Sequence, residues 1–405
     1  MAIASGIKKI TSFKKQSGLG VPASGTGGKE FRRTSTVFKA ERDMYESNEI
    51  QSHHMSTGAA YGLQKSEGTG DFELSPGTYA DLFAALIERN FAAITPGAAA
   101  AATTVAFVSG FTYTITRGAG SFLTDGIKAG HVIRISGSGI NAANVNKNLW
   151  VVSVTALVCT VYVINETPMV PEGPIATYVL TVVGKETFTP LAAHTEDYFT
   201  VEEWYSNISK SETFTDQKVG SVSIDMPSTG VNTGSFGLVG LGRTVGTSQV
   251  LTSPTATNTG ITAAINGLIM INGAVQPAVT SFALSVDKSA ENAGAVVGSN
   301  VGADVNTGRI RVSGTITAQF DSTTLRDLII SETVVPLDIV VAVDQTATSD
   351  FISFTVPAVK LTTDTPDDGE KTIVRTYTFT AEFFGSGGAS MARRNTIVQM
   401  QDSAA

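Results

Sequence analysis

Residues 308–328, GRIRVSGTITAQFDSTTLRDL, place a β-strand pattern directly before a helix signal. Apolar and polar side chains alternate over 309–320, with one break at Gly314, as expected for a strand that buries one face. Asp321 can then cap a helix whose apolar residues follow at helical spacing. The segment therefore predicts a strand that leads into a short helix.

The same helix signal occurs once upstream at a constant spacing. Each member of the set Thr78, Tyr79, Asp81 and Leu82 lies 246 residues before its counterpart in the set Thr324, Leu325, Asp327 and Leu328. The cap residues Ser75 and Asp321 share this spacing, and Pro76 suits the first helical position of the upstream copy. Two β-sheet modules, each carrying one short helix, are therefore predicted.

Other alternating or β-rich runs predict the remaining strands of the two modules. In the first module these runs are 34–41, 49–54, 71–74, 198–205, 219–226 and 235–241. In the second module they are 309–320, 337–343, 351–361 and 372–384.

A stretch of small residues at 98–102 marks the start of a different β-rich block, which runs to about Val183. Turn-separated runs at 111–116, 131–136, 150–154 and 159–164 predict a small barrel or sandwich. The predicted organisation is a flexible N-terminal arm (1–28), a discontinuous first module (29–97 and 184–242), an inserted β-domain (98–183), a linker (243–260), a second module (261–385) and a C-terminal tail (386–405).

The composition favours a protein that assembles with other subunits. Only 16% of the 405 residues are charged, and a monomer with so little charge is poorly protected against association. The net charge of −8 argues against a protein that neutralises nucleic acid phosphates over its whole surface. Positive charge is concentrated in the predicted arm, at Lys8, Lys9, Lys14 and Lys15.

Neither disulfides nor a membrane span are expected. Cys159 is the single cysteine, and it lies in an apolar run that predicts a buried, unreactive thiol. No apolar run reaches the ~20 residues that cross a bilayer, and no secretion signal is recognised. Synthesis in a reducing cytoplasm fits these features.

The sequence predicts no catalytic, cofactor-binding or metal-binding residues. His53 and His54 are adjacent, so on a strand they point to opposite faces and chelate one metal poorly. His131 and His194 have no partner at a defined spacing. The Gly-rich strings at 118–120 and 240–242 lack the residues that phosphate binding requires.

Several segments together resemble the major tail tube proteins of long-tailed, non-contractile bacteriophages. These are KKQSGLG (14–20) followed by SGTGGK (24–29), KVGSVSI (218–224) with TGSFGLVG (233–240), GRIRVSGTIT (308–317) and IVQMQDS (397–403). The resemblance covers nearly the whole chain. It rests on the order of these segments, because each string alone is common among β-rich proteins.

The resemblance implies a β-sandwich with a flanking helix that forms rings, and stacked rings that make a tube through which genomic DNA leaves the capsid. It also implies a relationship to the type VI secretion tube protein. Because such rings usually present six modules and this chain holds two, a homotrimeric ring with pseudo-sixfold symmetry is expected. The implied location is the virion tail, with terminator and distal tail proteins as further partners and DNA passing without specific binding.

An acidic channel is expected, since carboxylates repel phosphate. The channel-lining candidates are Glu202, Glu203, Asp225, Asp344 and Glu382, and the strands at 219–226, 235–241, 309–320 and 372–384 are candidates for the wall. The inserted domain is expected on the tube exterior. Loss of residues 1–28 is expected to leave folded subunits that fail to polymerise.

Two other interpretations fit the same composition. A β-rich adhesin shares the Thr and Gly richness and the low charge. A capsid decoration or tail-terminator protein of the same class of virus is the second alternative.

Overall fold

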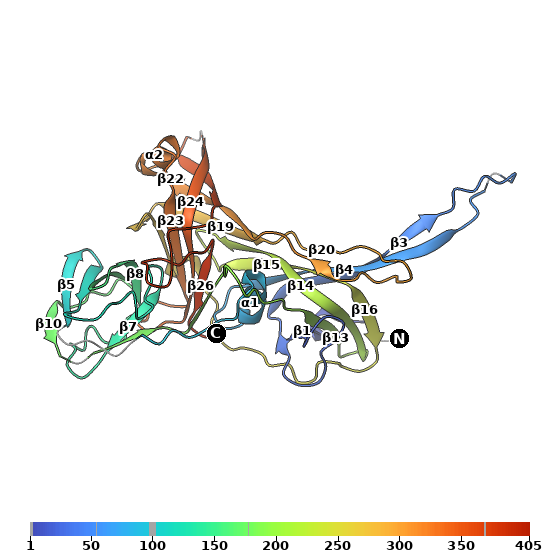
Figure 1. Ribbon diagram of the computed structural model, residues 1–405, viewed down its shortest axis with the longest axis horizontal. Coiled ribbons are helices and arrows are strands. Elements are labelled where there is room, and N and C mark those ends of the chain that lie inside the picture. Colours follow the sequence, from blue (N-terminus) through green and yellow to red (C-terminus); the bar gives the residue numbers. More distant parts are fainter. Residues whose placement is uncertain (1–2, 54, 97–102, 177, 368–369) are drawn as a thin grey trace.

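The computed structural model describes residues 3–53, 55–96, 103–176, 178–367 and 370–405. The molecule is elongated, with the inserted domain at one end and a long hairpin at the other (Figure 1). The prediction of a mainly β fold with two short helices is confirmed. No helix among the described residues is long and apolar enough to cross a membrane.

The first module is split in sequence by the inserted domain. Before the insertion it contains β1 (Lys9–Lys15), β2 (Lys29–Glu30), β3 (Arg33–Glu46), β4 (Ala59–Glu73) and α1 (Ala80–Ile87), with a 3₁₀ turn at Gly6–Lys8. After the insertion it continues with β12 (Lys185–Phe188), β13 (Phe199–Tyr205), β14 (Lys210–Met226), β15 (Thr233–Gly240) and β16 (Gly242–Gly246).

The second module occupies the rest of the chain. It contains a 3₁₀ turn at Ala264–Asn266, β17 (Gly267–Ile271), β18 (Ala274–Val275), β19 (Val279–Asp287), β20 (Glu291–Asn292), β21 (Val305–Asn306), β22 (Arg311–Gln319), α2 (Thr324–Ile330), β23 (Val335–Ala342), β24 (Phe351–Pro366), β25 (Val374–Ala381) and β26 (Gln399–Asp402).

One antiparallel sheet runs through both modules, and we call it the central sheet. Its strand order is β3-β4-β15-β14-β19-β22-β25-β24, and the pairing of β14 with β19 joins the modules. The first halves of β14 and β24 belong to a second layer in each module, where they pair with β13 and β16 and with β23 and β26, respectively. One hydrophobic core fills the space between the layers of both modules.

Matching irregularities show that the two modules repeat each other. Leu284 and Gly314 lie opposite each other in β19 and β22, and Phe38 and Gly68 lie opposite each other at the equivalent positions of β3 and β4. The ladder bulge between Arg33 and Ser35 recurs between Val279 and Ser281, at the same spacing along the chain. Bulges in the β13–β14 and β14–β15 ladders likewise recur in the β23–β24 and β24–β25 ladders.

The helices are also repeated, but the predicted alignment and caps are wrong. α1 begins at Ala80 and α2 at Thr324. The connection from strand to helix is two residues shorter in the second module than in the first. The spacing between the two helices is therefore two residues less than the spacing between the two preceding strands. Gly77 lies between Ser75 and α1 and has a φ of 73°, which is not helical, so Ser75 does not directly precede the helix. Thr323, rather than Asp321, precedes α2.

The inserted region forms its own seven-stranded sheet in the order β10-β5-β6-β9-β8-β7-β11. Its strands are β5 (Thr103–Ser109), β6 (Thr112–Thr116), β7 (Val132–Ser136), β8 (Leu149–Val154), β9 (Val158–Val163), β10 (Glu172–Ile175) and β11 (Val179–Val182). A separate core fills it, and the buried Cys159 belongs to that core. We call this region the inserted domain.

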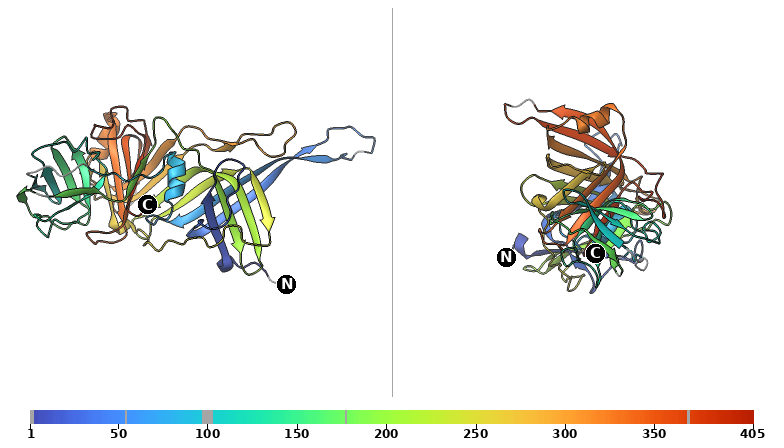
Figure 2. Two further views of the ribbon diagram at one scale, coloured as in Figure 1. Left: turned by 60° about the horizontal axis from the view of Figure 1, so that its bottom comes forward. Right: turned by 90° about the vertical axis from the view of Figure 1, so that its left-hand side faces the viewer.

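Although its sequence interrupts the first module, the inserted domain packs against the second. Trp150 and Tyr162 share a small hydrophobic cluster with Met270, Val340 and Phe351. This contact lies on the second-layer strands β17, β23 and β24, so the inserted domain forms an additional layer over them (Figure 2).

The segments predicted as a flexible arm, a linker and a tail all contribute strands to the sheets. In the predicted arm, β1 pairs with β13 along its whole length and buries Phe13. In the predicted linker, β16 pairs with β14 and Leu251 is fully buried. In the predicted tail, β26 pairs with both β12 and β24. These segments lack a long alternating pattern because their short strands add to sheets formed by distant parts of the chain.

The predicted strand at 49–54 is not found among the described residues of that range. Residues 49–53 lie in the connection between β3 and β4, and His54 lies outside the described residues.

Truncating Phe13 should destabilise the protein strongly, because its ring contacts Phe31 and Phe199 inside the core. Phe13→Ala is expected to lower the free energy of unfolding by about 4 kcal/mol in denaturant titrations. Ile7→Ala is the matched control, since Ile7 is 93% exposed, and we expect a change within about 0.5 kcal/mol. If both variants are neutral, the segment is a flexible arm after all. Deletion of residues 1–28 is now expected to impair folding as well as polymerisation.

Candidate functional site: the open face of the central sheet

One face of the central sheet packs on the hydrophobic core, and on the other, which we call the open face, the described residues form no hydrophobic core. Side chains alternate between these faces along each strand. On β14, for example, Val222 and Ile224 are buried in the core, while Ser221, Ser223 and Asp225 lie on the open face. The alternation is regular, so the sequence determines the character of both faces.

Hydroxyl groups dominate the open face. Its Ser and Thr residues include Ser35, Thr69, Ser221, Ser223, Thr233, Ser235, Ser281, Ser285, Ser313, Thr315, Thr317, Thr363, Thr365, Thr376, Thr378 and Thr380. Neighbouring strands are linked through some of them: Ser235 Oγ donates to Asp71 Oδ1 at 2.6 Å, and the hydroxyls of Thr317 and Thr376 lie 3.3 Å apart. These two cross-strand pairs occupy equivalent positions in the two modules.

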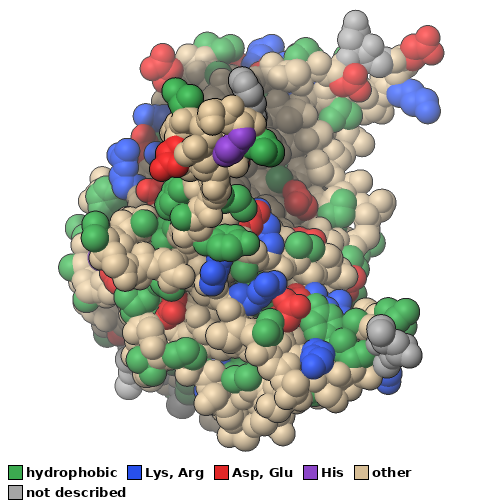
Figure 3. Space-filling model, turned by 90° about the vertical axis from the view of Figure 1, so that its right-hand side faces the viewer, with side chains coloured by type: hydrophobic (Ala, Val, Ile, Leu, Met, Phe, Trp, Pro, Cys, Tyr) green, Lys and Arg blue, Asp and Glu red, His purple; other side chains and the backbone are tan. Residues whose placement is uncertain are grey.

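Carboxylates outnumber cations on this face. The acidic residues include Glu41, Glu67, Asp71, Glu73, Asp225 and Asp287, and the basic ones include Lys39, Lys65, Arg311 and Lys360. Lys39 is already paired with Glu41 and Glu67, at 2.9 and 3.4 Å, respectively. Viewed from the hairpin end, the recessed surface beside the hairpin is largely uncharged (Figure 3). The open face is therefore polar, weakly acidic and poor in apolar side chains.

The carboxylates predicted to line the channel lie in different parts of the structure. Asp225 is exposed on the open face. Glu382 follows the end of β25 and forms an ion pair with Lys360 at 3.0 Å. Asp344 is exposed, but it lies in a turn outside the central sheet, where its carboxylate accepts hydrogen bonds from Thr346.

Glu202 and Glu203 do not lie on the open face, because both are buried in the β13 strand of the second layer. Glu202 accepts hydrogen bonds from the backbone N–H groups of Val250 and Leu251, at 2.7 and 2.6 Å, respectively. Glu203 forms an ion pair with Lys9 at 2.5 Å. Residues 199–203 of β13 are all buried, whether polar or apolar, so the alternation of side chains does not predict which of them are exposed.

Several open-face carboxylates were not predicted from the sequence, among them Glu67, Asp71, Glu73 and Asp287. The alternation of β4 and β19 was the available signal. It was overlooked in β4 because Gly residues replace apolar side chains at Gly68 and Gly70.

The central sheet ends in two unpaired borders. Among the described residues, β3 pairs only with β4, and the second half of β24 pairs only with β25. Unpaired N–H and C=O groups along a strand are a ready site for pairing with another chain.

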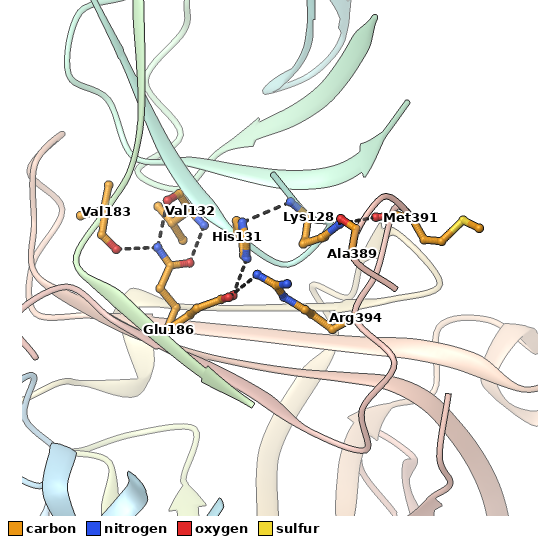
Figure 4. Close-up of polar contacts among 9 residues, drawn as sticks. Lys128, His131, Val132, Val183, Glu186, Ala389, Met391 and Arg394 are labelled. Atoms are coloured by element: carbon orange, nitrogen blue, oxygen red, sulfur yellow. Dashed lines mark hydrogen bonds and ion pairs between the residues drawn. The ribbon is translucent and has the colours of Figure 1, made fainter. Parts of the chain in front are cut away.

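Acidic and basic side chains also converge at one buried place, between the inserted domain and the second module (Figure 4). His131 Nε2 lies 2.8 Å from Glu186 Oε2, and the other carboxylate oxygen accepts a hydrogen bond from Arg394. Since His131 Nδ1 accepts from the backbone N–H of Lys128 at 3.1 Å, the neutral ring with its proton on Nε2 satisfies both contacts.

The other two polar side chains of this cluster, Lys128 and Gln401, form hydrogen bonds with backbone atoms. Lys128 Nζ donates to the carbonyl oxygens of Ala389 and Met391, each at 2.6 Å. Gln401 accepts from Val132 N and donates to the carbonyl oxygens of Val132 and Val183. The cluster therefore holds the inserted domain, β12 and the C-terminal segment together: Glu186 contacts His131 and Arg394, and the Lys128 ammonium group is held by backbone carbonyls.

Burial alone would raise the pKa of Glu186, but His131 and Arg394 outweigh it and lower the pKa below its usual value. Burial lowers the pKa of Lys128 to about 8. Burial therefore disfavours the charged form of both groups, and in Glu186 the contacts with His131 and Arg394 outweigh this effect.

No group of three or more potential metal ligands occurs among the residues that the structure describes. His53 is exposed, and its Nδ1 accepts a hydrogen bond from Met55 N. His194 Nδ1 lies 2.7 Å from Glu88 Oε2, a contact that the sequence did not indicate.

Comparison with known families gives one match. The family model described as phage tail tube protein matches residues 6–381. A search of the curated proteins gives no match.

The ionic cluster around Glu186 should contribute to stability in a pH-dependent way. Glu186→Gln places an amide donor against His131 or Arg394, and we expect it to lower the free energy of unfolding by about 3 kcal/mol at pH 7. Because the folded-state pKa of Glu186 is lowered, its contribution is present above the ordinary value of 4.5 and is lost as the pH falls below it. The difference between wild type and variant should therefore shrink in acid.

The matched control is Glu67→Gln, which removes a carboxylate from an exposed ion pair. Its unfolding free energy should stay within about 0.5 kcal/mol of wild type in the same denaturant titrations. Equal effects of the two substitutions would contradict the structural role of the cluster.

Proposed function

The chain belongs to the phage tail tube protein family, and we propose that it polymerises into stacked rings whose central sheets enclose the channel that delivers the phage genome. Membership of the family implies a structural component of the virion tail that assembles with itself and with other tail proteins. The rings, the channel surface and the interactions with terminator and distal tail proteins belong to our proposal.

The observation that carries the proposal is the central sheet itself. Two equivalent modules contribute four strands each to one continuous sheet, and no described segment pairs with either border of that sheet. A sheet whose two borders pair with neighbouring copies closes into a barrel, which removes every exposed edge. Such a barrel resists bending because each border is hydrogen-bonded along its length.

Three copies complete the ring in this proposal. Tail tube rings usually present six modules, and each chain holds two that repeat strand by strand, including their bulges. The join between β14 and β19 within one chain then resembles the join between chains, which gives the ring pseudo-sixfold symmetry.

The open face of the central sheet would line the channel. Its hydroxyl groups keep the surface wetted, and its excess of carboxylates repels DNA phosphates, so the genome can slide without binding. Asp225 remains a lining candidate, together with Glu67, Asp71, Glu73 and Asp287. Glu382 would lie at the end of this surface, beside Lys360.

The inserted domain would lie on the exterior of the tube. It packs on the second-layer strands of the second module, and the hydrophobic core separates those strands from the open face. Placing the open face inside the ring therefore places the inserted domain outside.

The β3–β4 hairpin would contact the next ring. It extends beyond the rest of the central sheet (Figures 1 and 2) and carries exposed apolar side chains, including Met44, Tyr45 and Tyr61. Exposed apolar groups on a projecting element favour contact with another protein surface.

A mass measurement tests the ring. Purified wild-type protein should form rings with three times the 42.2-kDa chain mass, and hollow tubes should be visible by electron microscopy. Rings of six copies would contradict the trimer. Monomers that form neither rings nor tubes under any condition tested would contradict the polymerising function and favour an adhesin.

A new positive charge on the open face tests the channel surface. Tubes of Ser223→Lys should retain short DNA duplexes at low salt and release them as salt increases, because each ring gains phosphate-binding charges inside. The retained DNA should be protected from nuclease. Thr181→Lys, on the exposed face of β11 in the inserted domain, is the matched control and should give no protected DNA. Unprotected DNA on Ser223→Lys tubes would place the open face outside.

A further inference from the structure

The contact between the two modules of one chain includes a buried ion pair. Lys288, directly after β19, lies with its Nζ 2.9 Å from Glu88 Oε1 and 3.2 Å from the carbonyl oxygen of Ala85. Glu88 and Ala85 belong to the C-terminal end of α1 in the first module. The ion pair therefore connects a strand of the second module to the helix of the first.

Each partner of this ion pair has a counterpart at the opposite borders of the chain. Arg42 in β3 corresponds to Lys288, because the matched ladders relate β3 to β19 at one constant spacing, and these two residues share it. Both residues follow the alternation toward the core side of the central sheet, and both are cationic. Arg42, however, lies on the unpaired border of the sheet.

Glu332 corresponds to Glu88 at the end of the other helix. Both residues have left-handed backbone geometry, with φ values of 53° and 63°, respectively. In both helices the next residue closes the same backbone hydrogen bond, from Arg89 N to Ala84 O and from Thr333 N to Leu328 O. The two glutamates therefore occupy the same position in the repeat, at the spacing that also relates the first residues of α1 and α2.

The counterparts differ from the internal pair in exposure. Lys288 and Glu88 have side chains that are only 6% and 17% exposed, respectively. Arg42 and Glu332 are both exposed, and Arg42 has a hydrogen bond to Gln64. Ile330 on α2 is 72% exposed, whereas the equivalent Leu86 on α1 is fully buried. The end of α2 thus has a charged and an apolar group in the place where α1 is covered by its neighbouring module.

We propose that Glu332 of one copy pairs with Arg42 of the next copy in the ring, so that the join between chains repeats the Lys288–Glu88 join within a chain. This inference rests on the proposed ring and names the residues that close it. The partner is a second copy of this chain, and complementary charge selects the correct border.

The repeat also fixes how the borders pair. Within the chain Ser223 lies opposite Ser285. Thr365 in β24 corresponds to Ser223 in β14, as the matched β14–β15 and β24–β25 ladders show. Lys39 in β3 corresponds to Ser285 in β19, as the matched β3–β4 and β19–β22 ladders show. Thr365 of one copy therefore lies opposite Lys39 of the next. This register brings the strand that carries Arg42 beside the module that carries Glu332.

Charge reversal tests the ion pair. Arg42→Glu and Glu332→Arg should each raise the protein concentration needed for ring formation by about tenfold or more, because each places like charges together. The double variant Arg42→Glu/Glu332→Arg should recover most of this loss. Lys210→Glu, a charge reversal at the exposed start of β14 and away from both borders, is the matched control and should assemble like wild type.

The outcomes separate this inference from the proposed function. If wild type forms rings and the single variants assemble equally well, the ion pair is wrong and the ring stands. If the single variants are impaired but the double variant is not improved, the two residues do not pair with each other. If wild type forms no rings, the proposed function itself fails. Circular dichroism and thermal unfolding of the monomers establish that the variants are folded.

A disulfide tests the register independently of charge. Lys39→Cys/Thr365→Cys should form covalent trimers in assembled rings on oxidation, since directly opposite residues in an antiparallel ladder lie within disulfide reach. The native Cys159 is buried and should not interfere. Assembled rings that yield only monomers on a non-reducing gel would contradict the register.

Discussion

The hydrogen-bonded ladder between β14 and β19 is the interaction on which the rest of the structure depends. It converts two small modules into one sheet and lets a single core run beneath both of them. α1 reinforces this join, because Phe83 contacts Phe236 in the first module and Phe354 in the second, with ring centroids 5.0 and 6.1 Å apart. Without the ladder each module would expose one further strand border. The open face is continuous for the same reason.

Much of this fold could be predicted from periodicity. The strands that bury one face, such as β14, β15 and β22, alternate clearly, so their faces follow from the sequence. The two helices were also recognised, although their alignment failed. Capping patterns locate helix ends only approximately, and they did not indicate the positive φ of Gly77 or the two-residue difference between the connections that precede the two helices.

The parts that could not be predicted depend on contacts between distant segments. β1, β16 and β26 are short strands that gain their partners from elsewhere in the chain, so their own sequences resemble flexible tails and linkers. Glu202 and Glu203 have the composition of a surface strand, yet β13 is covered on both sides. His131 and Glu186 are 55 residues apart and meet only because the inserted domain folds back onto β12. A single sequence carries no local signal for such pairs.

Joining the modules in one polypeptide also changes the energetics of forming a closed ring. The β14–β19 contact forms at the high effective concentration set by the short connection through residues 247–263, which for linked modules reaches the millimolar range. The contacts between separate chains have no such advantage and depend on protein concentration. In the trimeric ring that we propose, half of the seams would be complete before any subunits meet, and the other half would determine when assembly begins. Under this proposal, substitutions in β3, β24 and α2 would change the protein concentration at which rings form without disturbing the folded monomer.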